Sequence, residues 1–178
     1  MKISRADGTD AHERGIMAAF VLRLQFKNCS GAPEYVRFLH LNRLMPPLKT
    51  FIVEDNKVIY ENLVSTLEEL ANVQVVGHAR DEDAAVQWLR GGDEFDLMII
   101  DIFLLAGSGL GVLKAAQDAR LQVRRVVLTN YATADIRKRC ALLGADRVFD
   151  KSCELEDLIA YCERISDGSP ATGSSDLQ

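Results

Sequence analysis

The sequence from Leu48 to Ile165 predicts an α/β fold, a doubly wound parallel sheet of five strands with helices on both faces. Five short β-rich runs alternate with five segments whose apolar residues recur every three or four positions. The third run, Leu97–Ile100, contains no polar residue, which is typical of a central strand buried on both faces. Because crossovers between parallel strands are right-handed, few other arrangements satisfy this order.

The strands are predicted from short runs of β-forming residues, each bounded by turn or cap residues. In chain order they are expected at Thr50–Val53, Val73–Gly77, the apolar part of Phe95–Asp101, Val126–Thr129 and Arg147–Asp150.

Polar caps and glycines mark the ends of the expected helices. Asn56 and Asp81 are good N-terminal caps, while Gly91–Gly92 and Gly144 are good stops. The fourth helix is expected from about Thr133 to Leu143. Each helix has one apolar stripe that would face the sheet. The stripes are Ile59, Leu63, Leu67 and Leu70; Ala85, Trp88 and Leu89; Leu110, Val112, Leu113 and Ala116; Ile136, Cys140 and Leu143; and Leu155, Leu158, Ile159, Cys162 and Ile165.

The breaker Pro46–Pro47 divides the chain. Residues 1–47 have no clean strand or helix period, and we expect a poorly ordered or weakly helical N-terminal extension there. Met45 offers an alternative start just before the prolines. Residues 48–165 form the predicted domain, and residues 166–178, rich in Ser, Gly and Pro, are expected to be a disordered tail.

The formal net charge of −5 is unevenly divided. Residues 1–47 hold seven Lys and Arg against four Asp and Glu, a balance of +3. Residues 48–178 hold fourteen against twenty-two, a balance of −8. An acidic main body disfavours a nucleic-acid-binding surface, so no nucleic-acid partner is expected.

Cysteine usage and hydropathy indicate a cytoplasmic protein. The four cysteines form no C-x-x-C pair, and no histidine stands at metal-ligand spacing from them. The apolar stretch Ile16–Leu22 is too short to span a bilayer, and no secretory cleavage pattern follows the charged start. No membrane contact is expected.

Polar residues stand where the predicted strands end. Glu54–Asp55 follow the first strand, Asp101 the third, Thr129 closes the fourth and Lys151 follows the fifth. The carboxyl ends of parallel strands meet at one edge of the sheet, where open α/β sheets bind ligands. The sequence therefore places three carboxylates, a hydroxyl and an ammonium group in one crevice.

Three carboxylates at close range favour a resident cation, and hard oxygen ligands favour Mg²⁺. Asp55 and Asp101 would be direct ligands, with Glu54 direct or through water. An ammonium group and a hydroxyl beside a bound cation are best explained by a further anion, which we expect to be a phosphoryl group that Lys151 and Thr129 contact. Asp101 is then the expected nucleophile toward that phosphoryl group. Each residue also has an ordinary role as a helix-capping acid, strand-end hydroxyl or solvated charge, but their coincidence on one edge favours the site.

From Lys49 to about Ile165 the sequence resembles the receiver domains of two-component response regulators. The resemblance rests on five motifs: Phe51–Asn56, Ile99–Ile102, Ser108–Gly109, Val127–Tyr131, and Gly144–Asp146 leading to Lys151.

This resemblance implies the flavodoxin-like strand order 2-1-3-4-5 and a signalling role. Asp101 would be the phosphoacceptor, taking a phosphoryl group from a phosphohistidine of a sensor histidine kinase or histidine phosphotransfer protein. The backbone carbonyl of Phe103 would complete the Mg²⁺ site, and Thr129 and Lys151 would contact the phosphate. Thr129 and Val148 would form the switch region.

Two departures from the family pattern concern signalling more than phosphate chemistry. Ser152 stands after the lysine where the family commonly has proline, which leaves the isomer of the Lys151–Ser152 bond open. Val148 replaces an aromatic switch residue. A smaller departure is Leu105 in place of a loop proline.

Two other function classes fit less well. An aspartate-based phosphohydrolase of the haloacid-dehalogenase type would need a second acid two residues after Asp101, where Phe103 stands. A flavodoxin-like binding module would need a Ser-, Thr- or Gly-rich phosphate loop after the first strand, where the chain has Glu54–Asp55–Asn56.

The part of the chain after Lys151 is too short to fold as an output domain. We therefore expect a single-domain response regulator, not an enzyme, that acts by protein contact or by onward phosphotransfer in a relay. The resemblance places the output or self-association surface on the fourth helix, fifth strand and fifth helix. The charged residues of this surface are Arg137, Lys138, Arg139, Glu154, Glu156 and Asp157.

Phe103 and Tyr131 are expected to modulate dephosphorylation. Both would flank the path of the water that attacks the aspartyl phosphate in line, and both are bulky. The alternative is that they only pack on neighbouring loops or contact partners.

Overall fold

The computed structural model describes residues 46–167. The expected N-terminal extension, apart from Pro46 and Pro47, and the expected tail beyond Asp167 lie outside the described residues.

The described part of the chain contains one five-stranded parallel sheet in the order β2-β1-β3-β4-β5. This confirms both the predicted fold class and the strand order that the resemblance implied. The strands are β1 (Leu48–Val53), β2 (Val73–Ala79), β3 (Leu97–Ile100), β4 (Arg124–Thr129) and β5 (Arg147–Asp150).

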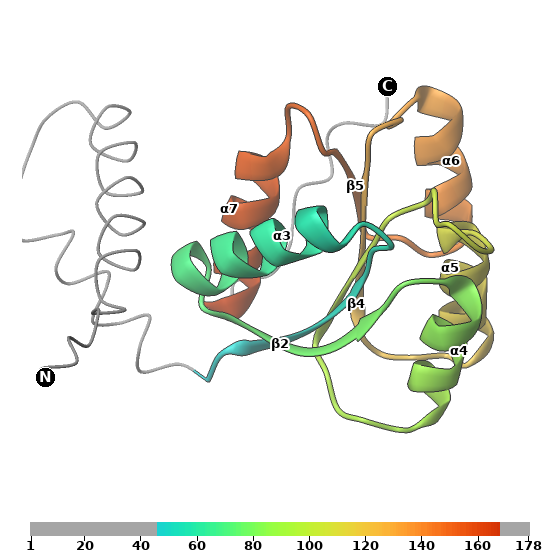
Figure 1. Cartoon of the computed structure of the whole chain (residues 1–178), viewed down its shortest axis with the longest axis horizontal. Helices are drawn as coiled ribbons and strands as arrows, with labels where there is room; N and C mark the ends of the chain where they lie inside the picture. The colour runs from blue at the N-terminus through green and yellow to red at the C-terminus, as the bar shows by residue number, and fades with distance from the viewer. Residues whose placement is uncertain (1–45, 168–178) are drawn as a thin grey trace, which may run out of the picture. The chain divides into compact units, whose positions relative to one another are not determined.

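Among residues 46–167, five helices cover the two faces of the sheet, as predicted (Figure 1). Helices α3 and α7 pack on one face, and α4, α5 and α6 pack on the other. All four residues of β3 are buried, and they contribute alternately to the two apolar clusters. The helices are α3 (Lys57–Leu70), α4 (Glu82–Arg90), α5 (Gly109–Asp118), α6 (Ala134–Leu142) and α7 (Leu155–Ser166).

Several predicted boundaries shift by one or two residues. Strand β2 continues to Ala79 because its last residues still pair with β1. Helix α7 includes Ser166, which was expected to begin the disordered tail. This serine is buried, and its hydroxyl accepts a hydrogen bond from the side-chain amide of Asn72. The Lys151–Ser152 peptide bond is trans.

Trp88 joins α4 to the sheet through aromatic stacking. Its ring lies 3.8 Å from that of Phe51, with an interplanar angle of 3°, and contacts Phe95 edge-on. A Cβ atom at Gly77 would lie only 2.5 Å from the Trp88 ring. Glycine is therefore required on β2 so that the indole can lie flat against the sheet.

Among residues 46–167, none of the helices combines the length and the apolar character needed to cross a membrane.

Gly77→Ala should lower the free energy of unfolding by about 1–3 kcal/mol, because the added methyl group overpacks a ring that Phe51 already holds in place. Urea unfolding followed by the fluorescence of the single tryptophan measures this directly. Gln74→Ala, at an exposed position of the same strand, is the control and should stay within about 0.5 kcal/mol of the parent chain. Equal stability of the two variants would contradict the packing role of Gly77.

Candidate functional site

The five polar residues predicted to meet at the carboxyl edge of the sheet do so. Glu54 and Asp55 follow β1, Asp101 follows β3, Thr129 ends β4 and Lys151 follows β5. Because β1 lies beside β3, and β3 beside β4, the three carboxylates share one crevice with the hydroxyl and the ammonium group. The crevice therefore follows from the strand order.

Lys151 is bonded to two of the three carboxylates. Its Nζ donates to Oε2 of Glu54 and to Oδ2 of Asp101, each at 2.6 Å. The three side chains are only 8%, 3% and 9% exposed, respectively. Water screens such contacts weakly, so the ammonium group and the carboxylates constrain one another strongly.

Asp101 is held in one orientation from three sides. Its Oδ1 accepts the amide of Phe103 at 3.2 Å, while its Oδ2 accepts Lys151. Its own amide donates to Val53 at the end of β1, at 2.9 Å. Contacts within the chain thus fix both the carboxylate and the backbone that carries it.

Glu54 is the most deeply buried acid of the site. Burial raises the pKa of its carboxyl above the usual value, and the hydrogen bond and charge of Lys151 partly oppose this shift. Its Oε1 accepts the amide of Asn56, and Asn56 in turn caps α3 through Val58 and Ile59. A further cation beside Glu54 would offset this cost of burial.

The acidic group fits a hard divalent cation. Glu54, Asp55 and Asp101 each offer a carboxylate oxygen, and these atoms lie within 4.8 Å of one another. Mg²⁺ prefers oxygen ligands and commonly uses one or two carboxylates together with water and phosphate oxygens. The donor set therefore fits the predicted cofactor in kind.

Thr129 is fully buried beside the charged residues. Its hydroxyl oxygen accepts the amide of Tyr131 at 3.5 Å, which leaves the hydroxyl proton available for donation. The Thr129 carbonyl accepts the amide of Lys151 at 3.0 Å. Thus β4 positions both the hydroxyl and the start of the segment that carries the lysine.

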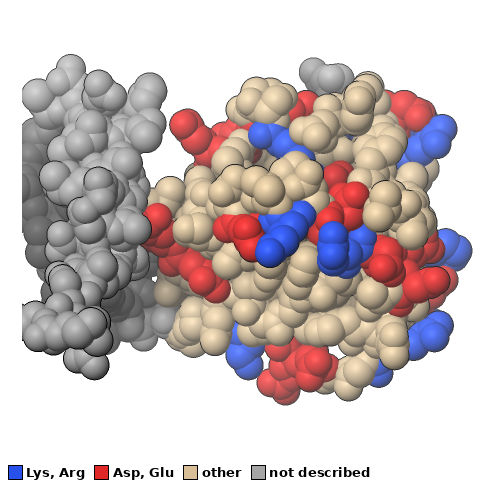
Figure 2. All heavy atoms as spheres, viewed as in Figure 1, with Lys and Arg blue, Asp and Glu red and all other residues tan. Residues whose placement is uncertain are grey.

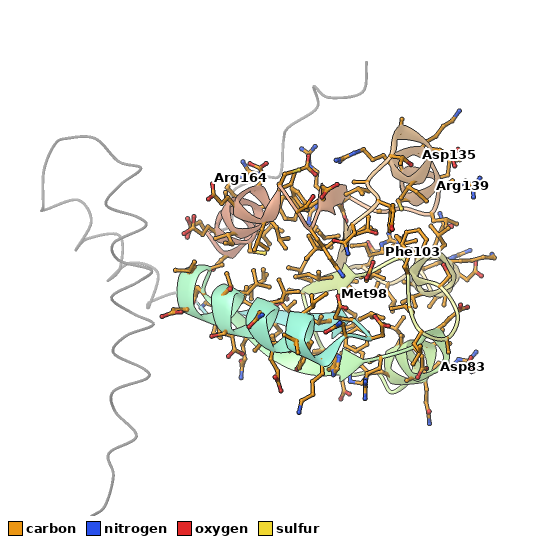
Figure 3. The ribbon with its side chains drawn as sticks, turned by 45° about the horizontal axis from the view of Figure 1, so that its top comes forward. Asp83, Met98, Phe103, Asp135, Arg139 and Arg164 are labelled. Carbon is orange, nitrogen blue, oxygen red and sulfur yellow. The ribbon has the colours of Figure 1, made fainter. Side chains whose placement is uncertain are left out.

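Phe103 and Tyr131 form an aromatic pair at the rim of the site. Their ring centroids lie 5.1 Å apart in an edge-on arrangement, and the side chains are 52% and 62% exposed. In the view of Figure 3, Phe103 is drawn between Met98 of β3 and Arg139 of α6. The pair joins the loops that follow β3 and β4.

Two residues that bond to the backbone of the acidic group were not identified from the sequence. His78 Nε2 donates to the carbonyl of Glu54 at 2.9 Å, and Arg80 donates to the carbonyl of Asp55 at 3.2 Å. The His78 ring also stacks on Tyr60 of α3, with a centroid separation of 3.7 Å. Both donors come from the end of β2, so the rule that identified the acids, polar residues at strand ends, could have identified them as well.

Arg137 of the expected output surface is committed to contacts within the chain. Its guanidinium donates to the carbonyls of Ala132 and Val148 and forms an ion pair with Glu154 at 2.8 Å. Arg139 pairs with Asp135 one helical turn away, at 2.9 Å. On the face seen in Figure 2, acidic and basic side chains are interspersed. Lys138, Glu156 and Asp157 are exposed.

Residues 50–163 match the family model described as the response regulator receiver domain. The chain belongs to this receiver family. The match covers the whole sheet apart from two residues of β1, together with every site residue.

Curated relatives of this receiver include transcriptional regulators. The chain is 31% identical over 113 residues to the transcriptional regulatory protein DltR of Streptococcus agalactiae, covering 64% of this chain and 49% of DltR. It is 26% identical over 124 residues to the Fimbriae Z protein of Salmonella typhimurium, covering 70% of this chain and 59% of that protein. The chain therefore spans about half the length of these relatives.

Solved receiver structures share the fold. The Francisella response regulator 1452 receiver domain superposes with a TM-score of 0.60 at 18% identity, covering 67% of this chain and 97% of that one. A DNA-binding response regulator of the LuxR family from Staphylococcus aureus superposes with a TM-score of 0.61 at 15% identity, covering 67% of this chain and 98% of that one. Such relatives do not support the expectation that nucleic acid plays no part in the function.

Lys151→Met should lower the free energy of unfolding in EDTA by about 3–5 kcal/mol, because two buried carboxylates lose their shared cation. Mg²⁺ should raise the melting temperature of this variant more than that of the parent receiver, since it supplies positive charge to the same oxygens. Calorimetry with and without Mg²⁺ tests both effects.

The matched control is Lys114→Met, which removes an ion pair whose two side chains are both 63% exposed and should cost at most about 1 kcal/mol. If Lys151→Met were no less stable than this control in EDTA, the central place of Lys151 in the site would be wrong.

Proposed function

We propose that this receiver accepts a phosphoryl group on Asp101 from the phosphohistidine of a sensor histidine kinase or phosphotransfer protein. The observation that carries the proposal is the double contact of Lys151 Nζ with Glu54 and Asp101, in a crevice that also holds Asp55 and Thr129. In this arrangement a nucleophilic carboxylate lies among groups that stabilise a phosphoryl group.

In the transfer, a carboxylate oxygen of Asp101 attacks phosphorus opposite the histidine nitrogen. The O–P bond forms as the N–P bond breaks, and the imidazole takes up a proton as it leaves. Lys151 can exchange its contact with Asp101 for a phosphoryl oxygen, and Thr129 can donate its hydroxyl proton to another. Both donors are already at the edge of the sheet where the negative charge arrives.

Mg²⁺ would be held by Asp55 and Asp101, by Glu54 directly or through water, and by the Phe103 carbonyl. It supplies positive charge to the phosphoryl oxygens when bound. The chain's own residues orient Asp101 and provide the remaining hydrogen-bond donors. Transfer of the phosphoryl group to Asp101 therefore needs no separate enzyme domain.

The output is proposed to be contact with another protein or onward transfer of the phosphoryl group. The surface formed by α6, β5 and α7 is the candidate for partner or homodimer contact. Lys138 and Arg139 on α6, with Glu156 and Asp157 on α7, offer opposite charges that would favour one register of association. Thr129 and Val148 are the proposed switch residues that connect the site to this surface.

Incubation with acetyl phosphate and Mg²⁺ should add a single phosphoryl group to the receiver, and Asp101→Ala should abolish it. Intact-mass measurement after rapid acid quenching detects the product. Asp118→Ala, which removes a surface carboxylate, should behave as the parent. Phosphorylation that persists in Asp101→Ala, or that needs no Mg²⁺, would overturn this assignment.

Phe103 and Tyr131 should slow hydrolysis of the aspartyl phosphate, because their paired rings hinder in-line approach of water. Phe103→Asn combined with Tyr131→Ala should shorten the half-life about tenfold, equivalent to about 1.4 kcal/mol in the barrier. Loss of the phosphoryl group is followed by mass spectrometry at fixed pH and Mg²⁺ concentration.

Leu105→Asn is the control for this pair, because it changes an exposed side chain of the same loop outside the aromatic contact. Mg²⁺ affinity should be unchanged in both cases. A double variant that loses its phosphate no faster than the control would show that the rings serve packing or partner contact instead.

A further inference from the structure

Glu82, the first residue of α4, bonds at two points to the loop between Asp101 and α5. Its backbone amide donates to the Ala106 carbonyl at 3.2 Å. Its carboxylate Oε2 accepts the backbone amide of Ser108 at 2.8 Å. The two bonds lie on either side of Gly107 and join helices that follow different strands.

Two glycines make room for the Glu82 carboxylate. A Cβ atom at Gly111 would lie 2.0 Å from Oε1, and one at Gly107 would lie 2.4 Å from the Cβ of Glu82. Gly107 also has a positive φ of 78°, which favours glycine on its own account. Gly111 has no such backbone reason and lies inside a helix, where glycine is less favourable than alanine. Its lack of a side chain is explained by the carboxylate that fills the space.

The hydrogen bond from the Ser108 amide to the Glu82 carboxylate takes the place of a capping box, a common arrangement at helix N-termini. Ser108 caps α5 by accepting the amide of Leu110 on its hydroxyl. In a capping box, the third helical residue would be Glu or Gln and would accept the amide of the cap residue. In α5 that third residue is Gly111, and Glu82 supplies the carboxylate from α4 instead. A negative charge is also favourable at this end of a helix.

The N-terminus of α5 rests directly on the backbone of the phosphoacceptor. The amide of Gly109 and the hydroxyl of Ser108 both donate to the carbonyl of Ile102, at 3.0 and 3.4 Å. A Cβ atom at Gly109 would lie 2.1 Å from the carbonyl oxygen of Asp101. A shift of Ser108 would therefore move Asp101 and the loop that begins with Phe103.

We propose that Glu82 is a positioning residue for the phosphoacceptor site: by bonding Ser108 from α4, it fixes the loop from Asp101 to Ser108 for Mg²⁺ and phosphoryl binding. This inference rests on the proposed function. Glu82 touches no reacting atom, so it acts through Ser108, Ile102 and the backbone of Phe103.

The first experiment compares Glu82→Ala, Glu82→Gln and Asp83→Ala in the full chain. Asp83 is the exposed neighbour of Glu82 on α4 and lies apart from Phe103 (Figure 3). Glu82→Ala should weaken Mg²⁺ binding about tenfold by calorimetric titration, and slow phosphorylation by acetyl phosphate accordingly. Glu82→Gln, which still accepts the Ser108 amide, should retain most of the affinity, and Asp83→Ala all of it.

The second experiment supplies a carboxylate from α5 in place of the one removed from α4. Gly111→Glu in the Glu82→Ala background places Glu at the third position of α5, where a capping box would carry it. This double variant should recover Mg²⁺ affinity and phosphorylation rate. Gly111→Glu alone should lower the melting temperature by about 2–4 °C, because two carboxylates then compete for one space.

Hydrogen exchange of the Ser108 amide without Mg²⁺ is a readout that is independent of phosphate chemistry. It should be faster in Glu82→Ala and restored in the double variant. Unchanged exchange and Mg²⁺ affinity in Glu82→Ala would overturn the proposal, as would a double variant that recovers melting temperature without Mg²⁺ affinity. A parent chain that takes up no phosphoryl group overturns the proposed function alone, and Ser108 exchange then still tests the Glu82 contact.

Discussion

The ammonium group of Lys151, held between Glu54 and Asp101, is the charge on which the site depends. Carboxylates brought this close repel one another, and burial makes the repulsion stronger. Burial raises the pKa of the Glu54 carboxyl, and the hydrogen bond and charge of Lys151 oppose this shift only in part. Additional positive charge at these oxygens would reduce the repulsion, and the proposed Mg²⁺ would supply it. Removing one partner of a buried ion pair is costly, but exchanging the whole pair for well-packed apolar residues is often neutral or stabilising, so these charges are better explained by what they bind than by stability.

The parallel strand arrangement is sufficient to bring these charged residues together. Parallel strands all end at one edge, and the neighbours of β3 are the two strands that carry the other acids and the hydroxyl. What the strands do not fix is the loop geometry beyond their last residues. That geometry depends on close backbone approaches, above all Gly109 against the carbonyl of Asp101, and on side chains from adjacent strands, such as His78 on the carbonyl of Glu54.

Sequence reasoning located the strands and the five polar residues because both follow simple rules, apolar runs and strand ends. It could not predict the contacts that Glu82 and Arg137 make. Glu82 looks like an ordinary acid in the first turn of a helix, and only the three-dimensional structure places it against Gly111. Arg137 looks like one member of an exposed basic run, yet it bonds to Val148 and Glu154. Contacts between residues on different elements leave no periodic signal, whereas burial and strand ends do.

The contacts of Arg137 connect the loop after β4 with β5 and with Glu154 before α7, within the proposed output surface. The loop after β4 is held at its start by the Thr129 hydroxyl, through the amide of Tyr131, and near its end by Arg137 on the carbonyl of Ala132. A hydroxyl that turns toward a phosphoryl oxygen exchanges its local contacts, and Thr129 is only three residues from Ala132. The same guanidinium also bonds β5 and α7, so displacement of this loop changes contacts on both. An aromatic side chain is therefore not the only means by which a receiver of this sequence could couple its site to its surface, because Arg137 bonds to the backbone carbonyl of Val148, the proposed switch residue.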